Sequence, residues 1–245
     1  MRLAVFDIDG TLTLGGGLGT RCFFLAFEEV FGVRDVDRSL AGYEHSTDCG
    51  IGREAATRVL GRLPTGIEMA AFKEAYLTRL QEEVGRTVSA YRPVPGAERV
   101  LDRLEEGGRD WRVAIATGNW RRAAVLKLAS AGVSQPGAAA CSEDGDSRPG
   151  VLATAVRRAA ELAGVAAFER VVYVGDQPWD LEAARIVGTG FVGIGSEERG
   201  SRLRARGARV VAGYEDFASF LDVLEAAADA DASAAATLTM PAPMS

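Results

Sequence analysis

Residues 2–11 read Arg-Leu-Ala-Val-Phe-Asp-Ile-Asp-Gly-Thr, and this stretch decides the fold. The apolar run at 2–6 has the length of a buried β-strand, and it stops at a carboxylate. Gly10 follows and lets the chain turn sharply. A run that ends in this way is typical of a parallel strand that leads into a loop at the edge of a sheet. We therefore expect a strand at 2–6, with Asp7 and Asp9 in the loop after it.

Strands of the same kind recur along the chain. Apolar runs lie at 112–116, at 171–174 and, more weakly, at 191–194. Helical patterns lie between the strands, at 96–106, 120–131, 150–163 and 180–187. This alternation predicts an α/β fold with a doubly wound, parallel, Rossmann-like sheet. Ligands bind beyond the carboxyl ends of such strands, so the polar residues found there are expected to converge on one site.

A different pattern occupies residues 18–90. It holds helical stretches at 20–31, 52–61 and 67–84 without a convincing strand, and we interpret it as an inserted helical cap. The catalytic core would then comprise 1–17 and 91–225, and Gly15-Gly16-Gly17 would serve as a hinge. The tail 226–245 is rich in Ala, Ser, Thr, Pro and Met without apolar periodicity, so we expect it to be disordered.

Composition excludes several classes of function. The net charge of −6 and pI near 5.1 differ from the basic face that nucleic-acid binders show. The three cysteines include no CxxC pair, which argues against a zinc knuckle or a disulfide framework. No segment approaches the roughly 20 apolar residues of a membrane helix. We expect a cytoplasmic monomer or homodimer with no nucleic-acid or membrane partner.

The Asp7-Ile8-Asp9 motif offers two carboxylates at the end of one strand. One carboxylate can attack a phosphorus atom while the other moves a proton. Taken alone, two aspartates after a strand are more often a turn with capping side chains. Other residues favour the chemical interpretation: Thr117 follows the next strand, a basic residue lies near 148, and Asp176, followed by Asp180, comes after a third strand.

These motifs, in this order, resemble those of the haloacid dehalogenase-like superfamily of hydrolases. The helical insert is similar to the cap of the phosphoglycolate phosphatase-like branch. The resemblance covers roughly residues 1–220. It implies a Mg²⁺-dependent phosphomonoester hydrolase that acts on a small phosphorylated metabolite through an aspartyl-phosphate intermediate. Dehalogenases of the superfamily typically lack the second aspartate, so Asp9 favours phosphate chemistry.

The resemblance also implies roles for individual residues. Asp7 would be the nucleophile, Asp9 the general acid and base, and Thr117 a ligand of a phosphoryl oxygen. Mg²⁺ would be bound by Asp7, Asp176 and Asp180, and by the backbone carbonyl of Asp9. Further contacts to the substrate would come from the loop residues Gly10, Thr11, Gly118 and Asn119.

One position departs from the family pattern. The superfamily normally has a lysine before its third motif, where spacing places Arg148, which keeps the charge but has a planar, forked geometry. Lys127 is the rival, but it lies ~15 Å down a helix from Thr117, which favours a solvated or snorkelling side chain. We therefore predict that Arg148 takes the role.

The polar cap segment 43–48 contains the only histidine of the chain. It would either dip over the phosphate site, with His45 and Thr47 contacting the substrate, or form an ordinary helix-capping loop.

Two alternative functions also remain open. A phosphomutase would use the same aspartyl phosphate, and a non-catalytic binding protein could keep the fold, although Asp7, Asp9, Thr117 and Asp176 together argue against the latter.

Overall fold

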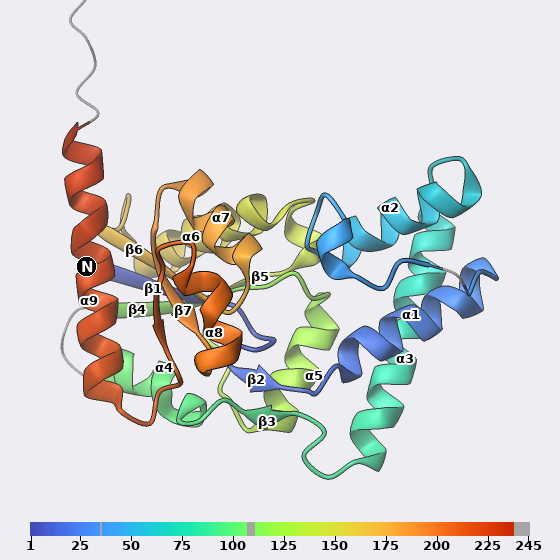
Figure 1. Ribbon diagram of the computed structural model, residues 1–245, viewed down its shortest axis with the longest axis horizontal. Helices are drawn as coiled ribbons and strands as arrows, with labels where there is room; N and C mark the ends of the chain where they lie inside the picture. The colour runs from blue at the N-terminus through green and yellow to red at the C-terminus, as the bar shows by residue number, and fades with distance from the viewer. Residues whose placement is uncertain (35, 107–110, 238–245) are drawn as a thin grey trace, which may run out of the picture.

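The computed structural model describes residues 1–34, 36–106 and 111–237. Its centre is a six-stranded sheet in which every neighbouring pair is parallel, in the order β5-β4-β1-β6-β7-β8 (Figure 1). The strands are β1 (Arg2–Phe6), β4 (Trp111–Ala116), β5 (Ala138–Ala140), β6 (Arg170–Gly175), β7 (Gly190–Ile194) and β8 (Arg209–Val211). The predicted α/β fold with a Rossmann-like parallel sheet is confirmed.

Helices cover both faces of this sheet. Along β1, Ala4 and Phe6 face one hydrophobic core while Leu3 and Val5 face another, as the two-residue period of a strand requires. The first core packs against α4 (Ala97–Glu106), α5 (Arg121–Ala131) and α9 (Phe217–Thr237). The second packs against α6 (Arg148–Ala163) and α7 (Pro178–Val187). Helix α8 (Glu197–Arg204) connects β7 to β8.

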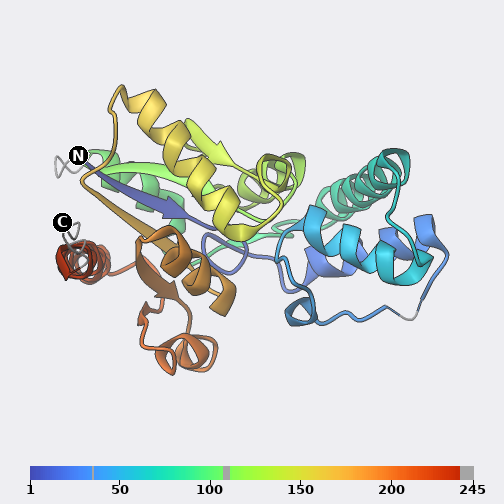
Figure 2. The ribbon, with the colours of Figure 1, turned by 90° about the horizontal axis from the view of Figure 1, so that it is seen from above.

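A separate group of helices lies beyond one end of the sheet (Figure 2). It consists of α1 (Leu18–Phe31), η1 (Leu40–Gly42), α2 (Asp48–Leu60) and α3 (Gly66–Arg86), which we call the cap helices. The chain enters and leaves this group through an antiparallel pair formed by β2 (Thr13–Leu14) and β3 (Arg92–Pro93). A short helical turn, η2 (Ser142–Asp144), follows β5 on the core side.

An aromatic cluster joins the cap helices to the core. Trp120, at the start of α5, packs between the rings of Phe23, Phe72 and Tyr76, with centroid separations of 5.9, 5.4 and 5.3 Å. Its indole N–H also points to Cys49 Sγ at 3.0 Å. Trp120 is 1% exposed, so it is a structural anchor between the two parts.

The short edge strands and the tail differ from the sequence-based expectations. The strands β5 and β8, each of three residues, carry too little periodicity to be recognised. The expected disorder of the tail 226–245 is wrong for its first part, because α9 continues to Thr237 and buries Ala227 and Ala228 against the sheet. Residues 238–245 lie outside the described part. No helix in the described ranges has the length and apolarity needed to cross a bilayer.

Candidate active site

The loop after β1 is built around one backbone carbonyl and one glycine. The amides of Thr11, Leu12 and Thr13 all donate to the carbonyl oxygen of Ile8, which folds the chain back at the strand end. Gly10 sits in this turn with φ of +79°, and a Cβ there would lie 2.1 Å from Asp176 Oδ2. Only glycine allows both this conformation and this close approach. The turn thereby brings the loop against the end of β6.

Three carboxylates meet at these strand ends. Asp7, Asp176 and Asp180 each offer an oxygen atom within 4.8 Å of the others. Asp180 is fully buried and is held by the hydroxyl of Tyr173 at 3.2 Å and the amide of Gln177 at 3.1 Å. Burial is the largest cause that raises the pKa of all three, and it brings that of Asp180 to about 7. Three carboxylates this close together and removed from water repel one another when all are ionised.

This carboxylate cluster suits a hard divalent cation. Asp176 Oδ1 is buried without a hydrogen-bond partner among the described residues, and an orphaned buried carboxylate oxygen calls for a compensating group. Carboxylate oxygens are the ligands that Mg²⁺ prefers. The Asp9 side chain is not part of this cluster, and the metal contact predicted for Asp9 is through its backbone carbonyl.

Arg148 is the cation within the cluster. As the first residue of α6, it follows Ser147, whose hydroxyl caps the helix by accepting the Gly150 amide. Its Nη1 lies 3.0 Å from Asp7 Oδ1, and its Nε lies 3.2 Å from Asp180 Oδ1. The fork of a guanidinium allows both contacts at once, which a single ammonium nitrogen would not. The structure thus places Arg148 where the sequence prediction expected it.

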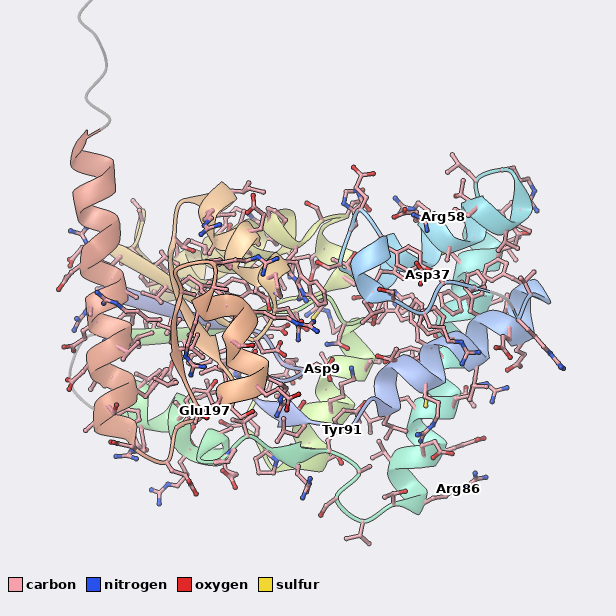
Figure 3. All side chains as sticks on the ribbon, in the orientation of Figure 1. Asp9, Asp37, Arg58, Arg86, Tyr91 and Glu197 are labelled. Carbon is pink, nitrogen blue, oxygen red and sulfur yellow. The ribbon has the colours of Figure 1, made fainter. Side chains whose placement is uncertain are left out.

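Asp9 faces a second cation. Lys127 Nζ donates to Asp9 Oδ2 at 2.5 Å and also to the side-chain oxygen of Asn119. The Asn119 amide completes the triangle by donating to Asp9 Oδ2 at 2.8 Å. Lys127 is only 3% exposed. Figure 3 shows Asp9 and Tyr91 in the region between the sheet and the cap helices.

The expectation of a solvated Lys127 is therefore wrong. Helix α5 begins at Arg121, so Lys127 lies ~9 Å along it rather than ~15 Å. Helical side chains also point back toward the N-terminus, and a long lysine regains much of that distance. The ion pair with Asp9 fixes it there.

The other predicted residues divide between the site and its scaffold. Gly118 and Asn119 line the cavity, whereas Thr117 lies fully buried beneath it, where its hydroxyl accepts the Asn119 side-chain amide at 2.8 Å. Thr11 is also fully buried and does not line the cavity; its carbonyl accepts the hydroxyl of Tyr214. A direct substrate contact by the Thr11 side chain is thus not supported.

The cap segment 43–48 has both of the properties that were weighed for it. Thr47 accepts the Gly50 amide at 3.1 Å as the N-cap of α2, and it also lines the cavity. His45 is half-buried and does not line the cavity, so the expectation that it contacts the substrate is not met. Asp48, which was not singled out as a site residue, does line it.

The cavity between core and cap has a volume of about 430 Å³, which is within the range of small-molecule sites. Its core side carries Asp7, Asp9, Gly10, Asn119, Arg148 and Asp176. Residues that sequence analysis did not assign to the site also line it, among them Phe23, Asp48, Tyr76, Tyr91 and Arg199. Apart from the polar character of the segment around Asp48, the sequence held no signal for this second group.

Comparison with known proteins identifies the family. The profile of the haloacid dehalogenase-like hydrolases matches residues 1–188. The chain belongs to this family. No curated protein sequence gave a significant match.

Solved structures of low sequence identity share the fold of this hydrolase. A hydrolase from Pseudomonas syringae is 18% identical with a TM-score of 0.64, and the match covers 91% of this chain and 98% of that one. A predicted phosphoglycolate phosphatase from Haemophilus somnus is 16% identical (TM-score 0.59; 89% and 97% covered). A protein provisionally assigned as a β-phosphoglucomutase from Thermotoga maritima is 19% identical (TM-score 0.56; 91% and 99% covered).

Proposed function

We propose that this hydrolase is a Mg²⁺-dependent phosphomonoesterase that acts on a small phosphorylated metabolite through an aspartyl-phosphate intermediate. The observation that carries the proposal is the position of Asp7. Its carboxylate lies at the end of the central strand, on the wall of the cavity, with Arg148 at 3.0 Å and Asp9 two residues away. This arrangement supplies a nucleophile, a neutralising cation and a proton carrier on one wall.

In the proposed reaction a carboxylate oxygen of Asp7 attacks phosphorus, and the bond from phosphorus to the leaving alcohol breaks. Asp9 donates a proton to the departing oxygen. A water molecule then attacks phosphorus and gives a proton to Asp9. The bond between phosphorus and Asp7 breaks, which releases inorganic phosphate and restores both carboxyl groups.

The neighbours of the two aspartates fit these roles. Arg148 offsets the negative charge of Asp7 and of an incoming phosphate. Lys127 and Asn119 both bind Asp9 Oδ2 and hold its carboxylate at the cavity wall. No hydrogen bond to Asp9 Oδ1 occurs among the described residues, so this oxygen would be the one that carries the proton. Mg²⁺, held by Asp7, Asp176, Asp180 and the Asp9 carbonyl, would neutralise further charge, so that an anionic ester can approach a carboxylate.

The size of the cavity supports a small substrate. A volume of about 430 Å³ under a layer of cap helices leaves room for a compact ester but not for a polymer. We propose accordingly that the partner is a small phosphate ester in the cytoplasm.

The test is phosphate release from a panel of small phosphomonoesters, with and without Mg²⁺, by the native protein and by Asp7→Asn. We expect release that requires Mg²⁺ and that the substitution abolishes. Release that persists in Asp7→Asn would contradict the covalent mechanism, and no release from any ester would contradict the function itself.

A further inference from the structure

The part of the cavity beyond Asp9 is where the leaving group of a phosphate ester would lie. The cap helices and the β2–β3 connections supply most of this wall, and most of the side chains are apolar or aromatic. They are Leu14, Leu18, Phe23, Ile51, Tyr76 and Tyr91. A carbon skeleton of limited size would be desolvated against them.

The charges on the cavity wall are unevenly distributed. Its three cations, Lys127, Arg148 and Arg199, all come from the core elements α5, α6 and α8. The first two are already paired with Asp9 and Asp7, and Arg199 is an exposed side chain of α8. In the described part of the cap helices, no lysine, arginine or histidine lines the cavity. Their one charged contribution is the carboxylate of Asp48.

The N-terminus of α2 cannot replace a missing cation. A free helix N-terminus attracts anions through its unpaired amides. Here the amide of Asp48 donates to the Gly118 carbonyl at 2.7 Å, and that of Cys49 donates to Ser142 Oγ at 2.8 Å. The Gly50 amide donates to Thr47. The amides in the first turn of α2 are therefore already hydrogen-bonded within the protein and do not offer a site for an anion.

One oxygen of Asp48 is anchored and the other is free. Its Oδ2 accepts the backbone amide of Trp120 at 2.8 Å, which fixes the carboxylate at the cavity wall. No hydrogen bond to its Oδ1 occurs among the described residues, and this oxygen is not enclosed. Burial raises the pKa of Asp48 to about 6, so the group is largely ionised at pH 7.5. Asp48 thus presents a fixed acceptor, not a donor, to whatever fills the cavity.

We propose that Asp48 is a specificity-determining residue that selects phosphate esters whose leaving alcohol donates a hydrogen bond and carries no second anionic group. The proposal rests on the phosphomonoesterase function above. A second carboxylate or phosphate would face Asp48 without a cap cation, and like charges brought together at an interface cost several kcal/mol. A hydroxyl or an ammonium group on a short carbon chain would instead satisfy Oδ1.

The proposal also bears on the phosphomutase alternative. A mutase must hold a doubly phosphorylated intermediate while one phosphate reacts at Asp7. The second phosphate would then lie in the part of the cavity where Asp48 is the charged group supplied by the cap. The charge distribution therefore favours transfer to water.

A matched series of two-carbon esters tests the proposal. The probes are 2-phosphoglycolate, 2-hydroxyethyl phosphate and O-phosphoethanolamine, in which the second carbon is, respectively, a carboxylate carbon, a CH2 that carries a hydroxyl and a CH2 that carries an ammonium group. We expect kcat/KM for phosphoglycolate to be at least about tenfold below that of the better of the other two, a conservative figure for like-charge repulsion. In Asp48→Asn, whose side-chain oxygen can still accept the Trp120 amide, the difference should shrink by about the same factor.

Two controls show whether a change in substrate preference comes from Asp48 itself. The first tests for a general structural effect, and the second measures binding without the chemical step. Asp146→Asn removes an exposed carboxylate at the cap–core boundary that pairs with Arg53 and does not line the cavity, so the ratios should stay unchanged. Calorimetric Kd values for the three esters, measured with Asp7→Asn, should show the same ranking without turnover.

The outcomes distinguish this inference from the function on which it rests. If all three esters release phosphate but phosphoglycolate ranks first, the inference is overturned and the phosphatase function stands. Loss of that preference in Arg199→Ala would place anion recognition at the rim of the cavity, which also overturns it. If no ester is hydrolysed, the proposed function fails, and a Kd ranking against phosphoglycolate that Asp48→Asn removes would still support selection by Asp48.

Discussion

Replacing Arg148 by methionine removes the cation that contacts Asp7 and Asp180. Both carboxylates are buried, and Asp176 lies close to them with an unpartnered oxygen. Removal of one partner of a buried ion pair typically costs about 3–5 kcal/mol, because a charge is left uncompensated. At about 2–4 °C per kcal/mol for a chain of this size, Tm should fall by roughly 6–20 °C at pH 8 in the absence of Mg²⁺.

The fall in Tm of the Arg148→Met variant should become larger as pH rises. The pKa of Asp180 is raised to about 7 in the folded protein, from an ordinary value near 3.8. The folded state therefore binds more protons than the unfolded state between these values, and the contribution of this group to stability is lost as pH rises through that window. At pH 5 the carboxylates of the Arg148→Met variant can take up protons, so the penalty should be small. Above pH 8 these carboxylates are ionised, so the Arg148→Met variant should show the full destabilisation.

The assay is thermal and urea denaturation from pH 5 to 8.5, without and with Mg²⁺. Arg148→Lys is the matched control, because it keeps the charge but has only one nitrogen to place between Asp7 and Asp180. It should retain most of the stability while kcat/KM falls by about tenfold or more, the scale of one misplaced charged contact. Equal Tm losses for Arg148→Met at pH 5 and pH 8, or a lysine variant as unstable as the methionine variant, would refute the electrostatic explanation.

Three further perturbations test other parts of the site. Lys127→Met should lower kcat by about tenfold or more by freeing Asp9 from its place, while urea denaturation should show a loss of only about 1 kcal/mol, because Asp9 is 45% exposed and screened. Gly10→Ala should cost about 1–3 kcal/mol and most of the activity, whereas Gly16→Ala, with φ of +55° and nothing within 4 Å, should show the backbone strain alone in the same assays. Mg²⁺ at 100 times its Kd should stabilise the protein by about 2.7 kcal/mol; EDTA should reverse the rise in Tm, and Asp176→Asn should abolish it.

The polar residues at the strand ends were predictable because their positions follow from local rules. A buried parallel strand ends in a loop, and the carboxyl ends of neighbouring strands meet at one edge. This rule predicts that Asp7 and Asp176 converge, and their carboxylate oxygens lie within 4.8 Å of each other. The position of Arg148 came instead from the spacing of the family pattern, and its Nη1 lies 3.0 Å from Asp7 Oδ1. The cap helices were also recognisable, since their apolar period differs from that of the strands.

The tail was predicted poorly for a physical reason. Alanine is the best helix former but the least hydrophobic of the apolar residues, so an alanine-rich segment shows little amphipathic pattern. Packing of Ala227 and Ala228 against the sheet supplies what the local pattern lacks. Tertiary contacts therefore stabilise a helix in the first part of a segment that the sequence pattern marked as disordered.

The sequence by itself determined the parallel sheet, the helical insertion and the aspartates at the strand ends, because each depends on residues close together in the chain. Tertiary structure alone decided which cation Asp9 faces and that Asp48 enters the site. Lys127 meets Asp9 across 118 positions of sequence, and Asp48 reaches the cavity only because α2 docks on Gly118 and Trp120. The direction and reach of a long side chain, and the packing of one group of helices on another, are set by the folded molecule as a whole, so no local pattern records them.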